Sequence, residues 1–563
     1  MGCVGLLINA VLNLYRFLRN ALVRVFRRPP DFVWIPVSGS LPEFETRRGL
    51  LRRRLGPRPS GPSLEGIRSR LDRILADGRP SGVVLRVENL DAGWASIEEL
   101  RHELERFKGR GKRVVAYLVD GGTRDYYLAS AADEIFATPL STLNVVGLSA
   151  RVNFLKDALA RVGVRTEVVA VSPYKSAGDT LARSDFSEES REQTERLVDR
   201  RFGALVAAVS AGRGMAPDEV RRLIDGAPYT PTAAVGKGLI DGVLYEDELP
   251  ERLGEGGRVW LEEWSGARRA LRVPYRRRAR RLVAVVGVEG TIVRGRSRKL
   301  PVPLPLVGRE QAGSDSVVAA LRLAERNRRA GAVLLHVDSP GGDALASDLM
   351  WREVERIRRK KPVVVLMGNA AASGGYYVSA AASHVVVREN TVTGSIGVIL
   401  TRPVASGLLE NLGVNPVTVE RGARSNLLDP RREPTADELS VLQSQLAAVY
   451  DEFKDRVVRG REMDPATLED LAGGRVWTGA EALERGLVDE VGGFRDALGK
   501  ARSLARMDGT DAGTFLKVSV PTGARPSPGD PVRDAVDAIL EAFAELKTSR
   551  VWAMVPYWVE DDL

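Results

Sequence analysis

The sequence predicts an α/β protein made of two tandem copies of one domain, and three observations predict it. Short β-branched strands alternate with amphipathic helices, which is typical of parallel βαβ units. Segments recur at a constant offset of 250 residues. The chain has 563 residues, of which 44% are apolar and 28% charged, so it can bury more than one domain core.

The repeat is visible in three matched segments of the two halves. Each pair has the same offset, so almost nothing is inserted between the copies. The pairs are VVLRVENLD at 83–91 with VLLHVDSPG at 333–341, YYLASAA at 126–132 with YYVSAAA at 376–382, and Gly147 with Gly397.

Each copy is expected to contain the same elements in the same order. The first strand is followed by a helix of about four turns, a second apolar strand, and a helix that the Tyr-Tyr segment opens. The expected ranges are 83–87, 96–108 and 113–119 in the first copy, and 332–337, 344–360 and 362–367 in the second, with a further strand starting at Leu282.

These elements predict five regions. They are an N-terminal amphipathic or membrane-anchoring segment at 1–30, an N-terminal repeat domain at 31–253, a basic linker at 254–281, a C-terminal repeat domain at 282–506, and a C-terminal extension at 507–563. The extension contains a Pro/Gly-rich loop and an expected helix at 532–546.

The N-terminal segment at 3–26 is largely apolar but carries Arg16, Arg19 and Arg24. Its uncharged stretch is shorter than the roughly 20 residues that a spanning helix needs. The charges follow the apolar run, which is the wrong order for a cleaved signal peptide. We therefore expect an amphipathic helix at a membrane surface, with docking on the protein's own body as the alternative.

Composition excludes several classes of function. The single cysteine, Cys3, excludes an internal disulfide and a multi-cysteine metal site. Arginine clusters at 47–54 and 268–281 raise the net charge to +9, but no stacking aromatics are interleaved with them. They predict solvated linkers or contact with anionic lipid rather than nucleic-acid binding. No metal and no cofactor is expected.

The two copies differ where chemistry is expected. The second copy follows its first strand with Asp-Ser-Pro-Gly-Gly, ending at Gly342, where backbone N–H groups can face an anion. It also places Ser373 among small residues at the start of a helix, whereas the first copy has Thr123 there. Ser373 is therefore a candidate nucleophile, with a helix N-cap as the alternative interpretation.

A serine nucleophile needs a base, and the first copy supplies one. Lys175 lies in VSPYKSAG, and its counterpart in the second copy is Ser425. The first copy thus keeps a lysine and lacks the serine and glycines, and the second shows the reverse. This complementary loss predicts one active site shared by the two copies.

Several motifs resemble the signal peptide peptidase SppA (protease IV) family in its long tandem-repeat form. The resemblance covers roughly residues 33–506. The motifs are VEGTIV at 288–293, DSPGG at 338–342, AASGGYY at 371–377, TGSIGV at 393–398, YKSAGD at 174–179 and RVWTGAEALERGLVDEVGG at 475–493.

The resemblance implies two Clp-protease/crotonase-like βαβ spiral domains and a Ser–Lys dyad split between the halves. It assigns Ser373 as nucleophile, Lys175 as base, Ser395 as the residue that orients the lysine amine, and Gly342 and Gly374 as oxyanion donors. It further implies peptide substrates such as remnant signal peptides, a membrane surface, a homo-tetramer and the bacterial inner membrane.

Three other functions are consistent with parts of the pattern. A crotonase-type acyl-CoA enzyme would share the fold and the glycines but use an acidic residue and no nucleophile. A Ser–His–Asp protease would need His384 or His336 as base. A membrane scaffold built on inactive domains would need neither the serine nor the lysine.

Overall fold

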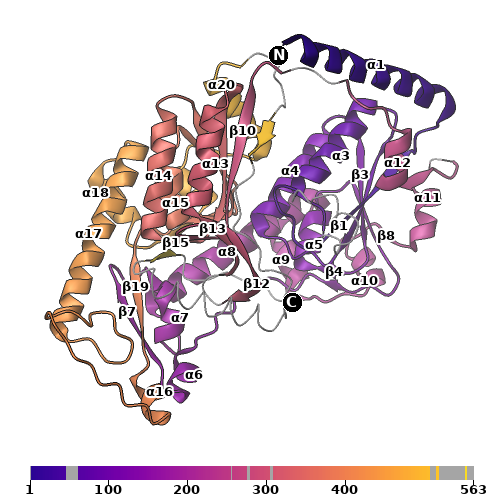
Figure 1. Cartoon of the computed structure of the whole chain (residues 1–563). Coiled ribbons are helices and arrows are strands. Elements are labelled where there is room, and N and C mark those ends of the chain that lie inside the picture. Colours follow the sequence, from indigo (N-terminus) through magenta and orange to yellow (C-terminus); the bar gives the residue numbers. More distant parts are fainter. Residues whose placement is uncertain are drawn as a thin grey trace. The chain divides into compact units, whose positions relative to one another are not determined.

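The computed structural model describes residues 2–45, 61–254, 256–275, 279–304, 308–507, 515–518 and 552–554. The arginine cluster at 47–54 and the expected helix at 532–546 lie outside these residues. The chain forms two compact units (Figure 1). The first consists mainly of Met1–Ser149 and Asp199–Arg278, and the second of Ala150–Val198 and Ala279–Asp562.

A six-stranded sheet forms the centre of the first unit. Its strands are parallel, in the order β8-β5-β3-β2-β1-β9. Val83, Val84 and Leu85 of β2 are fully buried, as expected for a parallel strand covered on both faces. The bounds are β1 Phe32–Ser38, β2 Gly82–Glu88, β3 Arg113–Leu118, β5 Glu134–Ala137, β8 Gly242–Val243 and β9 Leu261–Glu263.

Helices and a small two-stranded sheet complete this unit. Leu71 of α3 and Leu104 of α4 are fully buried in the core that the sheet forms. The helices are α3 Leu64–Asp77, α4 Trp94–Lys108, α5 Thr123–Ala129, α9 Pro217–Asp225, α10 Pro231–Gly236, α11 Leu249–Arg252 and α12 Trp264–Ala270, and the small sheet pairs β4 Gly121–Gly122 with β6 Leu143–Asn144.

Residues 254–281, expected as a linker, contain folded structure. Strand β9 extends the sheet beside β1, and α12 follows it immediately. The arginines that suggested a solvated linker include Arg268 and Arg269 in the last turn of α12. The carbonyl groups of this turn are hydrogen-bond acceptors for several other arginines.

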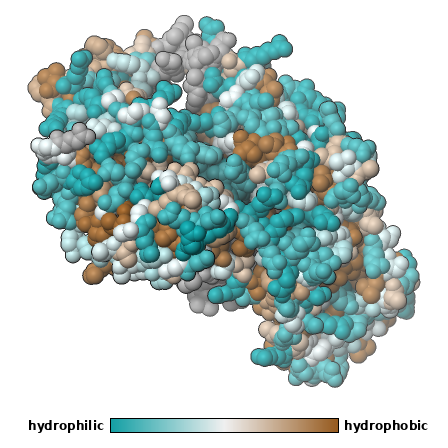
Figure 2. All heavy atoms as spheres, turned by 180° about the vertical axis from the view of Figure 1, so that it is seen from behind, coloured by the Kyte–Doolittle hydropathy of each residue, from teal (hydrophilic) through white to brown (hydrophobic). Residues whose placement is uncertain are grey.

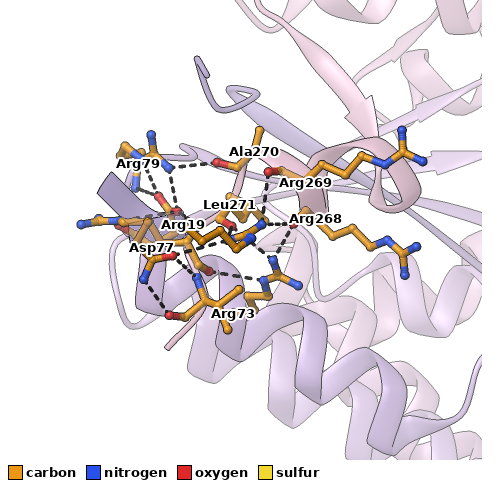
Figure 3. A network of polar contacts seen from close by, with 12 residues as sticks. Arg19, Arg73, Asp77, Arg79, Arg268, Arg269, Ala270 and Leu271 are labelled. Atoms are coloured by element: carbon orange, nitrogen blue, oxygen red, sulfur yellow. Dashed lines mark hydrogen bonds and ion pairs between the residues drawn. The ribbon is translucent and has the colours of Figure 1, made fainter. Parts of the chain in front are cut away.

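The N-terminal helix α1, Gly2–Phe26 (Figure 1), contacts these carbonyl groups through Arg19 (Figure 3). Arg19 donates to the carbonyls of Arg268, Arg269 and Leu271, and Arg73 of α3 donates to the first and last of these. Such contacts satisfy carbonyls that a helix C-terminus leaves without partners. No helix among the described residues has the length and hydropathy that a membrane-spanning segment requires.

The second unit is built on an eight-stranded, mainly parallel sheet. Its main path is β20-β18-β16-β14-β10-β22, and β17 joins β16 to β21. The bounds are β10 Leu282–Glu289, β14 Ala330–Ser339, β16 Val363–Ala372, β17 His384–Val387, β18 Val392–Gly394, β20 Val476–Thr478, β21 Glu490–Val491 and β22 Phe515–Lys517.

Helices pack on this sheet around the larger hydrophobic core. Asp343 caps α14, because its side chain accepts a hydrogen bond from the Ala346 N–H at 2.8 Å. The helices are α13 Ser314–Arg326, α14 Ala344–Arg358, α15 Gly374–Ala380, α17 Ala436–Arg461, α18 Pro465–Leu471, α19 Gly479–Glu484 and α20 Phe494–Leu504.

A seven-stranded sheet, also in the second unit, joins segments from distant parts of the chain. Its order is β12-β13-β11-β15-β23-β19-β7. The bounds are β7 Arg165–Ala170, β11 Thr291–Val293, β12 Arg298–Leu304, β13 Gly308–Gly313, β15 Gly341–Asp343, β19 Ile399–Val404 and β23 Trp552–Met554. Strand β7 comes from the first repeat and β23 from the C-terminal extension.

The pairing of β7 with β19 explains why the units do not coincide with the expected domains. Six residues of β7 pair antiparallel with six of β19. This pairing, with α6 (Lys156–Arg161), α7 (Asp179–Ala182) and the start of α8 (Glu188–Arg213), assigns residues 150–198 to the second unit. The expected boundary between the halves lay instead at 254–281.

The predicted fold class is confirmed. Strands β1, β2 and β3 of the first unit have the same parallel neighbour order as β10, β14 and β16 of the second. The face of the molecule in Figure 2 is predominantly hydrophilic, with apolar side chains in separate patches, as is usual for the surface of a folded protein.

Candidate active site

Ser373 stands at a sharp turn between β16 and α15. Its backbone has φ 54° and ψ −114°, a region that non-glycine residues avoid at a cost of roughly 1–3 kcal/mol. The turn is held because the Ser373 N–H donates to the Gly394 carbonyl at 2.7 Å and its carbonyl accepts from the Tyr377 N–H at 2.8 Å. A strained turn between a strand and a helix is one backbone setting in which enzymes hold a nucleophilic serine.

Lys175 is brought to the same place by the β7–β19 pairing. The chain leaves β7 at Ala170 and turns back so that the Lys175 N–H donates to the Ser172 carbonyl at 3.1 Å. Lys175 then precedes the short 3₁₀ helix Ser176–Gly178. Although it belongs to the first repeat by sequence, it lies in the second unit together with Ser373.

Within the described part of the chain, the lysine amine has three polar contacts, all with serines. Its Nζ lies 2.6 Å from Ser373 Oγ, 2.8 Å from Ser395 Oγ and 2.9 Å from the Ser395 carbonyl oxygen. Ser395 also has a positive φ of 52°, and its N–H donates to the Arg475 carbonyl at 2.6 Å. Both serines are fully buried, and Lys175 is 1% exposed.

Burial sets the protonation of Lys175. It lowers the pKa of the amine well below the usual lysine value, and no acidic side chain among the described residues opposes this shift. Gly474 and Gly397 close around the side chain: a Cβ on Gly474 would lie 2.6 Å from Lys175 Cα, and one on Gly397 would lie 3.3 Å from Lys175 Cδ. The site therefore favours an uncharged amine.

The backbones of Gly342 and Gly374 approach each other beside Ser373. A Cβ on Gly374 would lie 3.1 Å from Gly342 N and 2.5 Å from Ser347 Oγ. Gly342 has φ 156°, and a Cβ there would overlap the Ile292 carbonyl oxygen. Gly374 is the first residue of α15, where an N–H has no acceptor within the helix. Only glycine allows this approach.

Other residues considered from the sequence lie elsewhere. His384 Nε2 is 2.8 Å from Glu490 Oε2, and buried His336 faces Glu289 at 3.7 Å. Ser373 pairs with Lys175 and not with either histidine.

The counterparts of the paired residues in the opposite copies, Thr123 and Ser425, belong to different units. The Thr123 hydroxyl donates to the Gly147 carbonyl at 3.1 Å, within the first unit. Ser425, the counterpart of Lys175, is exposed in a turn.

Sequence reasoning did not find the residues that hold the Lys175 loop. Gln193 of α8 donates to the Tyr174 carbonyl at 3.1 Å and accepts from the Val476 N–H at 2.9 Å. The Arg475 guanidinium lies 3.7 Å from the centre of the Tyr174 ring. The Gly-Gly pair before the 475–493 motif was an available signal for the close approach of Gly474, but nothing in the sequence marks Gln193.

Comparison with known proteins gives consistent results. The family model described as Peptidase family S49 matches twice, at residues 106–259 and 355–508. The chain is 34% identical to "Serine protease SPPA, chloroplastic" of Arabidopsis thaliana over 90% of this chain and 76% of that protein. It is 31% identical to "Protease 4" of Haemophilus influenzae over 76% of this chain and 71% of that one. A shorter match, 36% identical over 37% of this chain and 60% of the relative, is to "Putative signal peptide peptidase SppA" of Enterococcus faecium.

Proposed function

We propose that this chain, which belongs to Peptidase family S49 and is a serine protease, hydrolyses peptide bonds with Ser373 as nucleophile and Lys175 as general base. The observation that carries the proposal is the 2.6 Å contact between Lys175 Nζ and Ser373 Oγ in a buried site. This distance is within reach of direct proton transfer.

The three contacts of the amine suit its neutral form. A neutral lysine amine has two N–H donors and one lone pair. The two oxygens of Ser395, at 2.8 and 2.9 Å, can accept the two N–H bonds. The lone pair is then directed at the Ser373 hydroxyl, which donates its proton as Ser373 Oγ attacks the scissile carbonyl. The resulting ammonium can protonate the leaving amine, and the amine can later activate water for deacylation.

The developing oxyanion needs fixed donors. The N–H groups of Gly342 and Gly374 are the candidates, because their backbones face each other beside Ser373. Removing one such donor costs roughly 10²–10³-fold in rate in other hydrolases. No side chain larger than hydrogen fits at Gly342 or Gly374, which suits a carbonyl that must approach the backbone closely.

The nucleophile is tested by a fluorophosphonate probe followed by peptide mapping. We expect the label on Ser373, and we expect Ser373→Ala to abolish labelling and peptide hydrolysis. Ser379→Ala is the matched control, because Ser379 is equally buried on the same helix but donates to the Gly375 carbonyl. Label on another residue, or near-native turnover by Ser373→Ala, would refute the assignment.

The base is tested by substitution and by pH. Lys175→Arg is expected to lose nearly all activity, since a guanidinium stays protonated. In the wild type, kcat/KM should rise with pH through the lowered pKa of Lys175 and then level off. A flat profile between about pH 5 and 9 contradicts a lysine base.

The substrate class and the membrane belong to the same proposal. We propose peptides in or near a membrane, such as cleaved signal peptides, as substrates, and the bacterial inner membrane as the location. The name of the Enterococcus faecium relative supports the substrate class. The expected homo-tetramer also stays a prediction, to be tested by mass photometry.

Helix α1 supports the membrane part of the proposal. Only Asn20 and Val23 among its described side chains are buried, whereas an apolar stripe is exposed. The stripe comprises Leu7, Val11, Leu14, Leu18, Leu22 and Val25. Its spacing of three or four residues places these side chains on one face of the helix. The segment also carries five arginines between residues 16 and 28 and no acid, which suits an anionic surface.

Sedimentation with phosphatidylglycerol vesicles tests this surface. The double variant Leu14→Asp/Leu18→Asp is expected to lose vesicle binding. Leu140→Asp, at a residue that is 94% exposed in the body of the first unit, should bind like the wild type. Equal binding by all three proteins would exclude α1 as the lipid contact.

A further inference from the structure

The C-terminal strand β23 occupies a place where an extended peptide could bind beside the candidate nucleophile. It pairs antiparallel with β15 through Gly341–Met554, Gly342–Ala553 and Asp343–Trp552. On its other side Trp552 pairs with Ile399 of β19. Strand β23 therefore fills the gap between β15 and β19 in the seven-stranded sheet.

The elements that β23 contacts are those that carry the proposed chemistry. Gly342, opposite Ala553, is one of the two proposed oxyanion donors. Strand β23 also contacts α15, the helix that starts directly after Ser373. On its far side, β19 pairs with β7, which leads to Lys175.

Strand addition is a general way to bind an extended peptide. A peptide between two strand edges gains main-chain hydrogen bonds on both sides and needs no particular sequence for them. A peptide substrate whose carbonyl reaches Gly342 and Ser373 would have to lie along β15. In the structure that edge is already paired, and Ser373, Lys175 and Ser395 are closed to solvent.

We propose that the C-terminal segment containing residues 552–554 is an intramolecular competitor that occupies the peptide-binding edge of β15 and must leave before a substrate binds. This inference rests on the proposed function, because it takes Ser373 and Gly342 as the reacting centre. It adds a regulatory role for the C-terminal extension, which has no counterpart in the repeat. A peptide in solution then competes with a strand that is always present in the same chain.

The expected effect follows from competition. If the edge is open in only a fraction of molecules, the apparent affinity for substrate falls by that fraction. Release of the segment should therefore lower KM and leave kcat nearly unchanged. For an edge that is open in one molecule in ten, KM would fall about tenfold.

Proline substitution releases the strand in the full-length chain. Ala553→Pro removes one backbone N–H and disfavours strand pairing at the residue opposite Gly342. Ala524→Pro is the matched control, since it makes the same change in the extension's Pro/Gly-rich segment. We expect faster fluorophosphonate labelling and a lower KM for Ala553→Pro only. Equal rates and KM values for wild type and Ala553→Pro would overturn the inference.

A second experiment fixes β23 in place with a reversible disulfide, whereas the proline variant releases it. Ile399 and Trp552 are paired residues, and such Cα atoms lie about 4.5–5.5 Å apart in antiparallel sheets, within the span of a disulfide. The variant Ile399→Cys/Trp552→Cys, with Cys3→Ser, should lose peptide hydrolysis on oxidation and regain it with dithiothreitol. The single Ile399→Cys variant should not respond. Full activity of a chain shown by mass spectrometry to be cross-linked would contradict the proposal.

The two proposals fail in distinguishable ways. If no variant is labelled at Ser373, the proposed protease site is wrong, and the competitor role of the C-terminal segment fails with it. If Ser373 is labelled at the same rate whether the segment is locked, native or disrupted, the dyad stands and the regulatory role of β23 is wrong.

Discussion

The burial of Lys175 should be visible as a dependence of stability on pH, and Lys175→Met isolates it. The folded protein keeps this amine neutral over a pH range in which the unfolded chain protonates it, because complete burial lowers its pKa. Unfolding in this range takes up one proton. The wild type therefore gains stability as pH rises from the lowered pKa toward the usual lysine value of 10.5.

The size of the effect follows from proton linkage. One additional proton on the unfolded state changes the free energy of unfolding by about 1.4 kcal/mol per pH unit. Methionine has a similar shape and no charge, so the variant lacks this dependence. It also lacks the three contacts with Ser373 and Ser395, each worth about 0.5–1.5 kcal/mol. The loss of these contacts lowers the free energy of unfolding by an amount that depends little on pH.

Urea unfolding followed by tryptophan fluorescence measures the difference between the two proteins. Between the lowered pKa of Lys175 and the usual lysine value, the stability of Lys175→Met relative to wild type should be highest at the low-pH end. It should fall by about 1.4 kcal/mol per pH unit as pH rises. A difference that is constant from pH 6 to 9 would show that Lys175 titrates alike in both states, and the physical basis for a lysine base would be lost.

Three further predictions concern two residues beside Lys175 and one histidine outside the candidate site. Gly474→Ala should lower kcat at least about tenfold, since its new Cβ would overlap the lysine backbone and φ is +88°; Gly499→Ala, with open space around it, should not. Ser395→Ala should lower kcat about tenfold with KM unchanged, because one hydrogen bond that orients the amine is lost; a change in KM alone would refute this role. His384→Ala should retain kcat within about twofold, and a loss on the order of 10³-fold would instead favour a Ser–His–Asp mechanism.

Local sequence patterns predicted much of the fold. The strand expected at 83–87 is β2, Gly82–Glu88, and the one expected at 332–337 is β14, Ala330–Ser339. The helix expected at 96–108 is α4, Trp94–Lys108. These elements were predictable because buried parallel strands are continuous apolar runs and the helices between them keep a regular period.

The meeting of Lys175 and Ser373 was predictable from complementary loss between the copies, but the path that joins them was not. Strand β7 pairs with β19, more than 200 residues away in the sequence, and periodicity carries no information on such partners. The same limit applies to β23. Its three residues lie in a segment that the sequence predicts to be an extension outside the repeat. They form a strand through tertiary pairing with β15 and β19.

The interpretation of 254–281 as a linker did not anticipate β9 and α12. It was based on the arginine and glycine content of the segment and not on its hydrophobic pattern. The many arginines suggested a solvated segment, whereas the Arg272 guanidinium forms an ion pair with buried Asp77. The helix-end carbonyls of the segment accept hydrogen bonds from arginines elsewhere in the chain, namely Arg19, Arg73 and Arg79. Arginine is as suited to that role as to solvent, so a count of charges does not distinguish the two.

The assignment of residues 150–198 to the second unit has a practical consequence. A protease cut anywhere in 254–281 would leave the amine on one fragment and the hydroxyl on the other, although both belong to a single folded body. Under the proposed Ser–Lys mechanism, neither fragment alone would hydrolyse peptides. Recovery of hydrolysis after the two fragments are mixed would then measure how tightly β7 of one fragment binds β19 of the other.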